Sequence, residues 1–256
     1  MGSCEPSPRK VGVYFSVLDE TQRSGRHKTM KHRPTIIAVS GFSSNVGKTT
    51  LVCELLRKLP GWEAIKLTRG HYRSCGRDPA GCCVSDLIRD EPVVRSGREA
   101  NYQPGKDTGR FWDSNAANVH WVIVKDDQVA QGISEALGRV EADGVIVEGN
   151  SFLEYVIADL AIMCARAEGG KIKASARKAL SRSDYLYLST LDASARIAKE
   201  QFEAFRLGLT LPLNLNLPVI THADLSILLS EIQLGRRRPR IDNTLNGCNP
   251  FVMHRV

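Results

Sequence analysis

The sequence predicts an α/β fold of three layers, with a mostly parallel sheet and helices on both of its faces. Residues 35–59 begin this pattern as a strand, a small polar loop and a helix. From residue 119 to residue 232, short apolar and β-branched runs alternate with segments of helical periodicity. Strands that alternate with helices, without an internal repeat, indicate a parallel sheet covered on both faces.

The first strand, 35–39, leads into a loop with the composition of a phosphate-binding loop. Small residues precede Gly47, Lys48 and Thr49, and apolar residues at helical spacing follow over 51–59. Backbone N–H groups at a helix start bind phosphate oxygens, the lysine reaches the β- and γ-phosphates, and the threonine hydroxyl is a Mg²⁺ ligand. We therefore expect a nucleotide to contact these residues: Gly41, Ser43, Ser44, Asn45, Val46, Gly47, Lys48, Thr49 and Thr50.

This loop departs from the usual spacing. Five residues separate Gly41 from Gly47 where the consensus has four, and Phe42 holds the position of the first glycine. The alternative is a chance Gly-Lys-Thr in a surface turn. The flanking strand and helix argue against that alternative, because they supply the structural context that the motif needs.

The other elements follow from the same two periodicities. Two end signals support them, since Gly208 is suited to stop a helix and Thr221 and Asp224 have the spacing of a capping box. We expect strands at 63–68, 119–124, 145–149, 158–164, 185–189 and 217–221, and helices at 129–140, 174–180, 197–205 and 224–232.

The chain divides into three parts. We expect residues 34–235 to form the nucleotide-binding domain, and residues 69–118 within it read as a long irregular insert of the kind that serves as a lid or binding loop. Residues 1–33 read as a mobile extension, so that the folded unit could begin at Met30. Residues 236–256 read as a basic tail.

Charge and hydropathy exclude several classes of protein. The net charge of +7 comes from the two ends, because residues 1–33 carry seven Lys/Arg against three Asp/Glu and residues 235–256 carry five against one. A basic face built into the fold is therefore not indicated, although the arginines of the tail leave an RNA or phosphate contact as an alternative. No apolar run reaches the roughly 18 residues of a membrane span. We expect a cytoplasmic protein with no membrane partner and no nucleic-acid partner.

Three further charged residues are expected beside the phosphate loop. Glu148 ends the apolar strand at 145–149 and Lys66 lies near the end of the strand at 63–68, so both belong to the ligand-binding rim of the sheet. Beside a phosphate loop, Glu148 suits a second Mg²⁺ ligand next to Thr49. The alternative is a charge at an exposed strand end. Asp107, in the insert, is a second carboxylate candidate.

Several of these segments together resemble the molybdopterin-guanine dinucleotide biosynthesis protein B family, which belongs to the SIMIBI class of P-loop NTPases. The spacing of the phosphate loop and the Val46 before Gly47 are similar instead to dethiobiotin synthetase, another member of that class. The matching segments are scattered over 35–235: residues 39–43, 47–51, Lys66, 105–110, 147–149 and 217–219.

Two functions follow from these resemblances. The first is Mg²⁺-dependent binding and hydrolysis of GTP or ATP by an accessory protein that works with a partner in the biosynthesis of a molybdopterin-type cofactor. The second is an ATP-dependent kinase or ligase that activates a small acid. In either case we expect Lys48, Lys66, Asp107 and Glu148 to be catalytic, Thr49 and Glu148 to bind the metal, and the protein to be a homodimer. Asn-Lys-x-Asp, the usual guanine-recognition sequence, is absent, and residues 189–192 are a weak substitute.

The seven cysteines do not suggest a disulfide framework, since their number is odd and their spacing uneven. Cys53 and Cys164 lie in apolar elements and read as buried side chains. His71, Cys75, Cys82 and Cys83 lie within thirteen residues of the insert. They could hold zinc or an iron–sulfur cluster, remain reduced thiols of a mobile loop, or contact an anionic or sulfur-rich ligand.

Overall fold

The computed structural model describes residues 33–70, 84, 87–190, 194–208 and 217–233. Nearly all of the predicted extension and the whole basic tail lie outside these residues. The same holds for His71, Cys75, Cys82 and Cys83, and for Leu191 and Asp192 of the candidate base-recognition segment.

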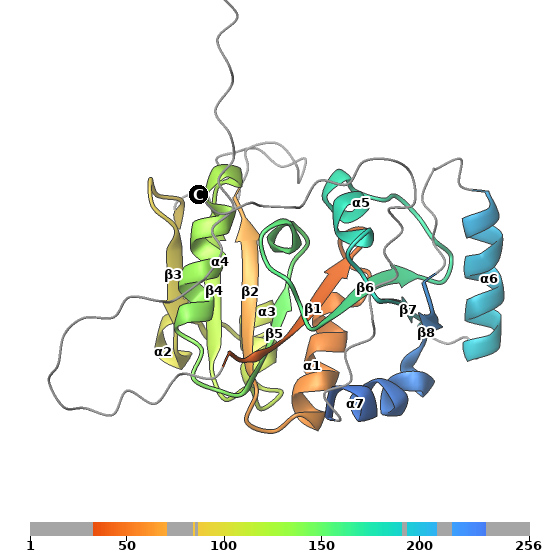
Figure 1. Cartoon of the computed structure of the whole chain (residues 1–256), viewed down its shortest axis with the longest axis horizontal. Helices are drawn as coiled ribbons and strands as arrows, with labels where there is room; N and C mark the ends of the chain where they lie inside the picture. Colours follow the sequence, from red (N-terminus) through yellow and green to blue (C-terminus); the bar gives the residue numbers. More distant parts are fainter. Residues whose placement is uncertain (1–32, 71–83, 85–86, 191–193, 209–216, 234–256) are drawn as a thin grey trace, which may run out of the picture.

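The described strands form one sheet of eight strands in the order β3-β4-β2-β5-β1-β6-β7-β8 (Figure 1). All neighbouring strands are parallel except β3, which pairs with β4 in the antiparallel direction at one edge. The strands are β1 (Thr35–Gly41), β2 (Glu63–Arg69), β3 (Val93–Ser96), β4 (Val119–Val124), β5 (Gly144–Glu148), β6 (Leu160–Arg166), β7 (Tyr185–Ser189) and β8 (Val219–Ile220).

Helices cover both faces of this sheet, and short 3₁₀ turns lie in some of the connections. The helices are α1 (Lys48–Lys58), α2 (Arg98–Asn101), α3 (Asp107–Trp112), α4 (Val129–Gly138), α5 (Ala174–Leu180), α6 (Ala195–Leu207) and α7 (Leu225–Gln233). The 3₁₀ turns are η3 (Asp126–Gln128), η4 (Ser151–Glu154) and η5 (His222–Asp224).

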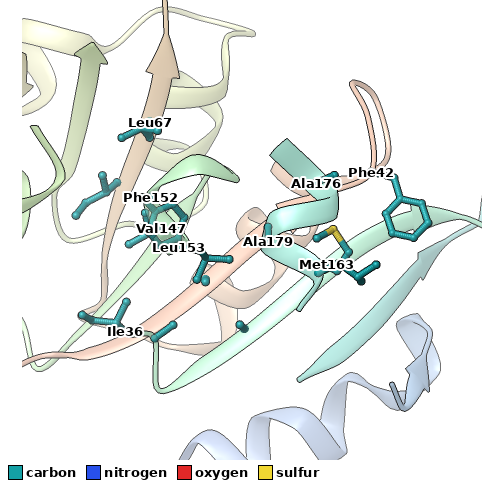
Figure 2. Packing of buried hydrophobic residues seen from close by; sticks show 14 of the residues in the cluster. Ile36, Phe42, Leu67, Val147, Phe152, Leu153, Met163, Ala176 and Ala179 are labelled. Carbon is teal, nitrogen blue, oxygen red and sulfur yellow. The ribbon is translucent and has the colours of Figure 1, made fainter. Parts of the chain in front are cut away.

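Two hydrophobic cores result, one on each face, because successive side chains of a strand point to opposite sides of the sheet. Along β1, Ile36 and Ala38 pack in the core that contains residues of α4, α5 and α6. Ile37 and Val39 pack in the other core, with residues of α1, α3 and α7. Figure 2 shows part of the first core, where Ala176 and Ala179 of α5 lie beside Met163 of β6.

The mostly parallel α/β sheet with helices on both faces is confirmed. Three predicted elements have the observed bounds, namely the strands at 119–124 and 185–189 and the helix at 174–180. Gly208 is the C-cap of α6, and Thr221 and Asp224 form the predicted capping box, although a 3₁₀ turn precedes the helix there. The last strand is much shorter than predicted and comprises only Val219–Ile220.

The insert at 69–118 is not irregular throughout, as the sequence suggested. Its described residues include the edge strand β3 and the helices α2 and α3. These elements are only four to six residues long, which is too short for periodicity to reveal them. None of the helices in the described part of the chain has the length and apolar character needed to cross a lipid bilayer.

Candidate functional site

The loop between β1 and α1 has a backbone that only particular residues tolerate. Gly47 is the N-cap of α1 and has a φ of 84°. A β-carbon at this position would lie 2.7 Å from Cβ of Ser189 at the end of β7, so there is no room for a side chain. Asn45 also adopts a positive φ, of 59°, which asparagine tolerates better than most residues.

The unusual spacing of the loop has a structural reason. A β-carbon on Gly41 would lie 2.7 Å from the Val46 side chain and 2.9 Å from that of Lys48. Phe42, which holds the place of the usual glycine, instead turns its ring into the core, 6.2 Å from the ring of Phe202 in α6. The loop thus keeps a glycine, Gly41, where its two ends meet, and the extra residue allows Phe42 to pack in the core and fix the start of the loop. A strand, this loop and a helix in sequence are the defining unit of the P-loop NTPase fold.

Lys48 begins α1 and its ammonium group reaches back across the loop. Its Nζ donates a hydrogen bond to the carbonyl oxygen of Ser43, at 3.0 Å. Burial lowers the pKa of Lys48, against the opposing effect of the Glu148 carboxylate. A partly desolvated ammonium interacts strongly with an anion, because less water competes for it.

Thr49 lies next to Lys48 and joins two carboxylates. Its Oγ1 donates to Oδ1 of Asp107 at 3.0 Å and lies 3.1 Å from Oε2 of Glu148. The other oxygen of each carboxylate contacts Nζ of Lys66, at 2.5 Å in both cases. A hydroxyl, two carboxylates and an ammonium therefore form one closed network.

The strands and helices explain how four distant residues meet. Lys66 and Glu148 are register partners on the parallel strands β2 and β5, which bring them to the same rim of the sheet. Asp107 is the first residue of α3, and α3 is fixed against the body because Phe111 is fully buried in the core that α1 shares. Thr49 faces them from the first turn of α1.

The network is largely withdrawn from solvent. Side-chain exposure is 1% for Glu148, 16% for Lys66 and 41% for Asp107. Burial alone would lower the pKa of Lys66, but the Glu148 and Asp107 carboxylates outweigh it and raise that pKa. Burial would likewise raise the pKa of Asp107, and the Lys66 ammonium with the Thr49 hydroxyl lowers it instead. Lys66 and Asp107 are thus held in their charged forms.

The donor set fits Mg²⁺. No group of three His, Cys, Asp or Glu residues suited to a metal ion occurs among the described residues, which leaves no all-protein cage there. Mg²⁺ in nucleotide sites takes one or two carboxylates and completes its shell with phosphate oxygens and water. Thr49 Oγ1 and the carboxylates of Glu148 and Asp107 are hard oxygen donors, and they lie within hydrogen-bond distance of one another.

The structure therefore brings together Thr49, Lys66, Asp107 and Glu148, beside the loop residues and Lys48. The alternative for Glu148, a charge at an exposed strand end, is excluded by its burial. Cys53 and Cys164 are free and buried as predicted, and burial raises the pKa of both thiols. Thr50 accepts a hydrogen bond from the guanidinium of Arg110, at 3.2 Å.

Sequence reasoning missed Asn150, Arg166 and Lys173. The amide of Asn150 forms two hydrogen bonds with the backbone of Gly41, from Gly41 N to Oδ1 and from Nδ2 to Gly41 O, both at 2.9 Å. It thereby ties the segment after Glu148 to the start of the loop. The position of Asn150 just after a strand end was the signal that could have found it. Arg166, which is the last residue of β6, gave the same signal.

No protein-family model and no curated protein matches the sequence. Among solved structures, the chain is similar to HypB from Helicobacter pylori in complex with nickel, with 12% identity, a TM-score of 0.44, and coverage of 80% of this chain and 90% of that one. It is also similar to LpxK from Aquifex aeolicus in complex with ATP, with 15% identity, a TM-score of 0.41, and coverage of 73% and 53%. A third similar structure is that of a putative plasmid partition protein from Borrelia burgdorferi B31 bound to AMPPNP, with 15% identity, a TM-score of 0.36, and coverage of 75% of this chain and 88% of that one. At this distance, substrate and partners have to be inferred from the residues of this chain.

Proposed function

We propose that this protein binds a nucleoside triphosphate with Mg²⁺ at the β1–α1 loop and hydrolyses it. One observation carries the proposal. The hydroxyl of Thr49, directly after the loop lysine, lies within 3.0 to 3.1 Å of two carboxylates that come from other parts of the chain. A structural network would not need that hydroxyl at the mouth of a glycine-containing loop, whereas a nucleotide–Mg²⁺ site does.

Each residue then has a role that its position allows. The loop backbone and the Lys48 ammonium bind the β- and γ-phosphates, and their charges are already in place before the reaction. Thr49 and Glu148 hold Mg²⁺, with Asp107 supporting them directly or through water. Bound Mg²⁺ supplies charge neutralisation of the phosphate oxygens. Lys66 holds both carboxylates in place, and it adds a positive charge near the transferred group.

The finer form of the proposal is an accessory protein in the biosynthesis of a molybdopterin-type cofactor, using GTP or ATP as a homodimer with a partner protein. It rests on the resemblance of the segments 39–43, 47–51, 105–110 and 147–149 to the corresponding family. The second candidate is a kinase or ligase that activates a small acid with ATP. The five residues between Gly41 and Gly47 favour it, since this is the spacing of dethiobiotin synthetase.

Hydrolysis by the purified full-length protein tests the shared proposal. Release of phosphate from GTP and ATP should require Mg²⁺, and Lys48→Ala should lower the rate at least 100-fold, because the phosphate charge loses its fixed partner. Lys125→Ala is the matched control, since the Lys125 ammonium forms a surface ion pair with the exposed Asp90. A Lys48→Ala protein with the wild-type rate would refute the assignment. Stimulation by one small acid would favour the second candidate, and stimulation only by a partner protein the first.

A further inference from the structure

Three cations converge on three successive residues of the phosphate loop. Lys48 donates to the carbonyl oxygen of Ser43 at 3.0 Å. Nζ of Lys173 donates to Oγ of Ser44 at 3.0 Å, and Nε of Arg166 donates to the carbonyl oxygen of Asn45 at 3.2 Å. Only the first of these cations belongs to the loop motif, and the proposed function leaves the other two without a role.

Lys173 is fixed beside the loop by its own backbone. Its N–H donates to the carbonyl oxygen of Phe42 at 2.9 Å, and the residue is the N-cap of α5. The side chain is exposed. Its charge also acts on the loop lysine, because the pKa of Lys48 is lowered first by burial and further by the nearby ammonium groups of Lys66 and Lys173. The positive charge of Lys173 therefore contributes to the electrostatic potential where the β- and γ-phosphates are expected to bind.

Arg166 reaches the loop from the neighbouring strand. It is the last residue of β6, and Cys164, two residues earlier, is the register partner of Gly41 at the end of β1. Arg166 is consequently at the same rim as the loop, with an exposed side chain.

Neither cation has the partner that a structural role would predict. In the described part of the chain, Lys66 pairs with two carboxylates, whereas no ion pair is formed there by Arg166 or Lys173. Each makes one hydrogen bond to a neutral oxygen of the loop, although an ammonium group has three N–H donors and a guanidinium group five. Exposed cations held against a phosphate loop in this way are suited to a further anionic group.

We propose that Lys173 and Arg166 form a second cationic subsite, which binds the terminal phosphate of a nucleoside triphosphate and distinguishes it from a diphosphate. The proposal rests on the proposed function, since it assigns part of the same nucleotide. Lys48 serves both nucleotides, because it also reaches the β-phosphate. The added subsite instead acts on the one phosphate that hydrolysis removes, and so it favours substrate over product.

Equilibrium binding of matched nucleotides tests this subsite. Dissociation constants are measured by calorimetry, with Mg²⁺ and the full-length protein, for the β,γ-imido analogues of ATP and GTP and for ADP and GDP. Lys173→Gln and Arg166→Gln should each reduce the preference for triphosphate over diphosphate about tenfold, the usual effect of losing one hydrogen bond to a charged group. Diphosphate affinity should stay within about twofold of wild type.

Two variants serve as controls. Lys171→Gln removes an exposed lysine of the same connection that, among the described residues, forms no hydrogen bond to the loop, so it should leave the preference unchanged. Lys173→Arg should restore most of the preference, because it keeps the charge. Unfolding temperatures without nucleotide show that each variant is folded.

The outcomes separate this proposal from the proposed function. An unchanged preference in Lys173→Gln and Arg166→Gln, or an equal loss for triphosphate and diphosphate, would overturn the subsite and leave the nucleotide site in place. A loss of the same size in Lys171→Gln would also overturn it, since general charge would then be the cause. A wild-type protein that binds neither triphosphate would overturn both proposals.

Discussion

Replacing Lys66 by methionine should destabilise the protein in a way that depends on the charge of Glu148. The substitution keeps an unbranched side chain of similar length and removes the ammonium that contacts both carboxylates, each at 2.5 Å. Glu148, only 1% exposed, would then lie beside Asp107 with no cation between them.

The size of the effect follows from this burial. Removing one partner of a buried ion pair usually lowers the free energy of unfolding by about 3 to 5 kcal/mol. Asp107 is 41% exposed and water can solvate that side of the network, so we expect the lower end of the range. Lys66→Met should therefore lower the free energy of unfolding by about 3 kcal/mol at neutral pH without Mg²⁺.

Urea unfolding of four proteins measures the effect as a double-mutant cycle: wild type, Lys66→Met, Glu148→Gln and the double variant. Glutamine keeps the shape of Glu148 and removes its charge. In that background Lys66→Met should cost only about 1 kcal/mol, which gives a coupling of about 2 kcal/mol. Lys125→Met is the control, because its surface ion pair with the fully exposed Asp90 should contribute little to stability.

A loss of stability that is the same with Glu148 and with glutamine at that position would refute the reasoning. It would mean that packing of the Lys66 methylene groups, and not its charge, stabilises the rim. Mg²⁺ gives a second check, since it should stabilise Lys66→Met more than wild type by supplying the missing positive charge.

Three further predictions concern the loop and the opposite end of the sheet. Gly47→Ala should weaken triphosphate binding at least tenfold and destabilise the protein more than Gly61→Ala. Both glycines have a positive φ, but only at Gly47 would a β-carbon lie 2.7 Å from Ser189. Equal effects of the two substitutions in calorimetry and urea unfolding would count against the close approach. Asn150→Ala should lower the free energy of unfolding by about 1 to 3 kcal/mol, since it leaves two backbone groups of the loop unpaired, and weaken triphosphate binding, whereas an effect on stability alone would limit Asn150 to a structural role. Burial would raise the pKa of Glu63, but hydrogen bonds from a histidine and two backbone N–H groups lower it. The stability that these hydrogen bonds give the folded protein should be complete above the ordinary Glu63 pKa of 4.5, and it should disappear as the pH falls through the lower pKa of the folded state. Glu63→Gln should flatten that acid limb in urea unfolding, and an unchanged limb would disprove the role of Glu63.

The fold and half of the site were predictable for the same reason. Strands β1, β2 and β4 to β7 contribute to both cores and read as apolar runs, and their carboxyl ends meet at one rim, which places Lys66 and Glu148 near the loop. The last strand was overestimated because only Val219–Ile220 pairs with β7, although the apolar run is longer. Apolar composition indicates a buried segment but does not show where pairing ends.

The remaining parts of the site depend on contacts that have no local pattern. Asp107 reaches Thr49 only because α2 and α3 fold onto the body, and Asn101 of α2 fixes α3 by accepting from Trp112 and Thr108. Lys173 is positioned by a hydrogen bond between its backbone and Phe42, distant in sequence. Such contacts arise from tertiary packing, which a single sequence does not display.

The Mg²⁺ dependence of triphosphate binding tests the central claim most directly. Dissociation constants of the β,γ-imido analogues of ATP and GTP are measured for wild type and Glu148→Gln, with Mg²⁺ and with a chelator. If Thr49 and Glu148 hold the metal against the phosphates, Mg²⁺ should tighten binding to wild type at least tenfold for one of the two nucleotides, and this gain should largely disappear in Glu148→Gln. Equal affinity with and without Mg²⁺, or the same gain in both proteins, would contradict the account.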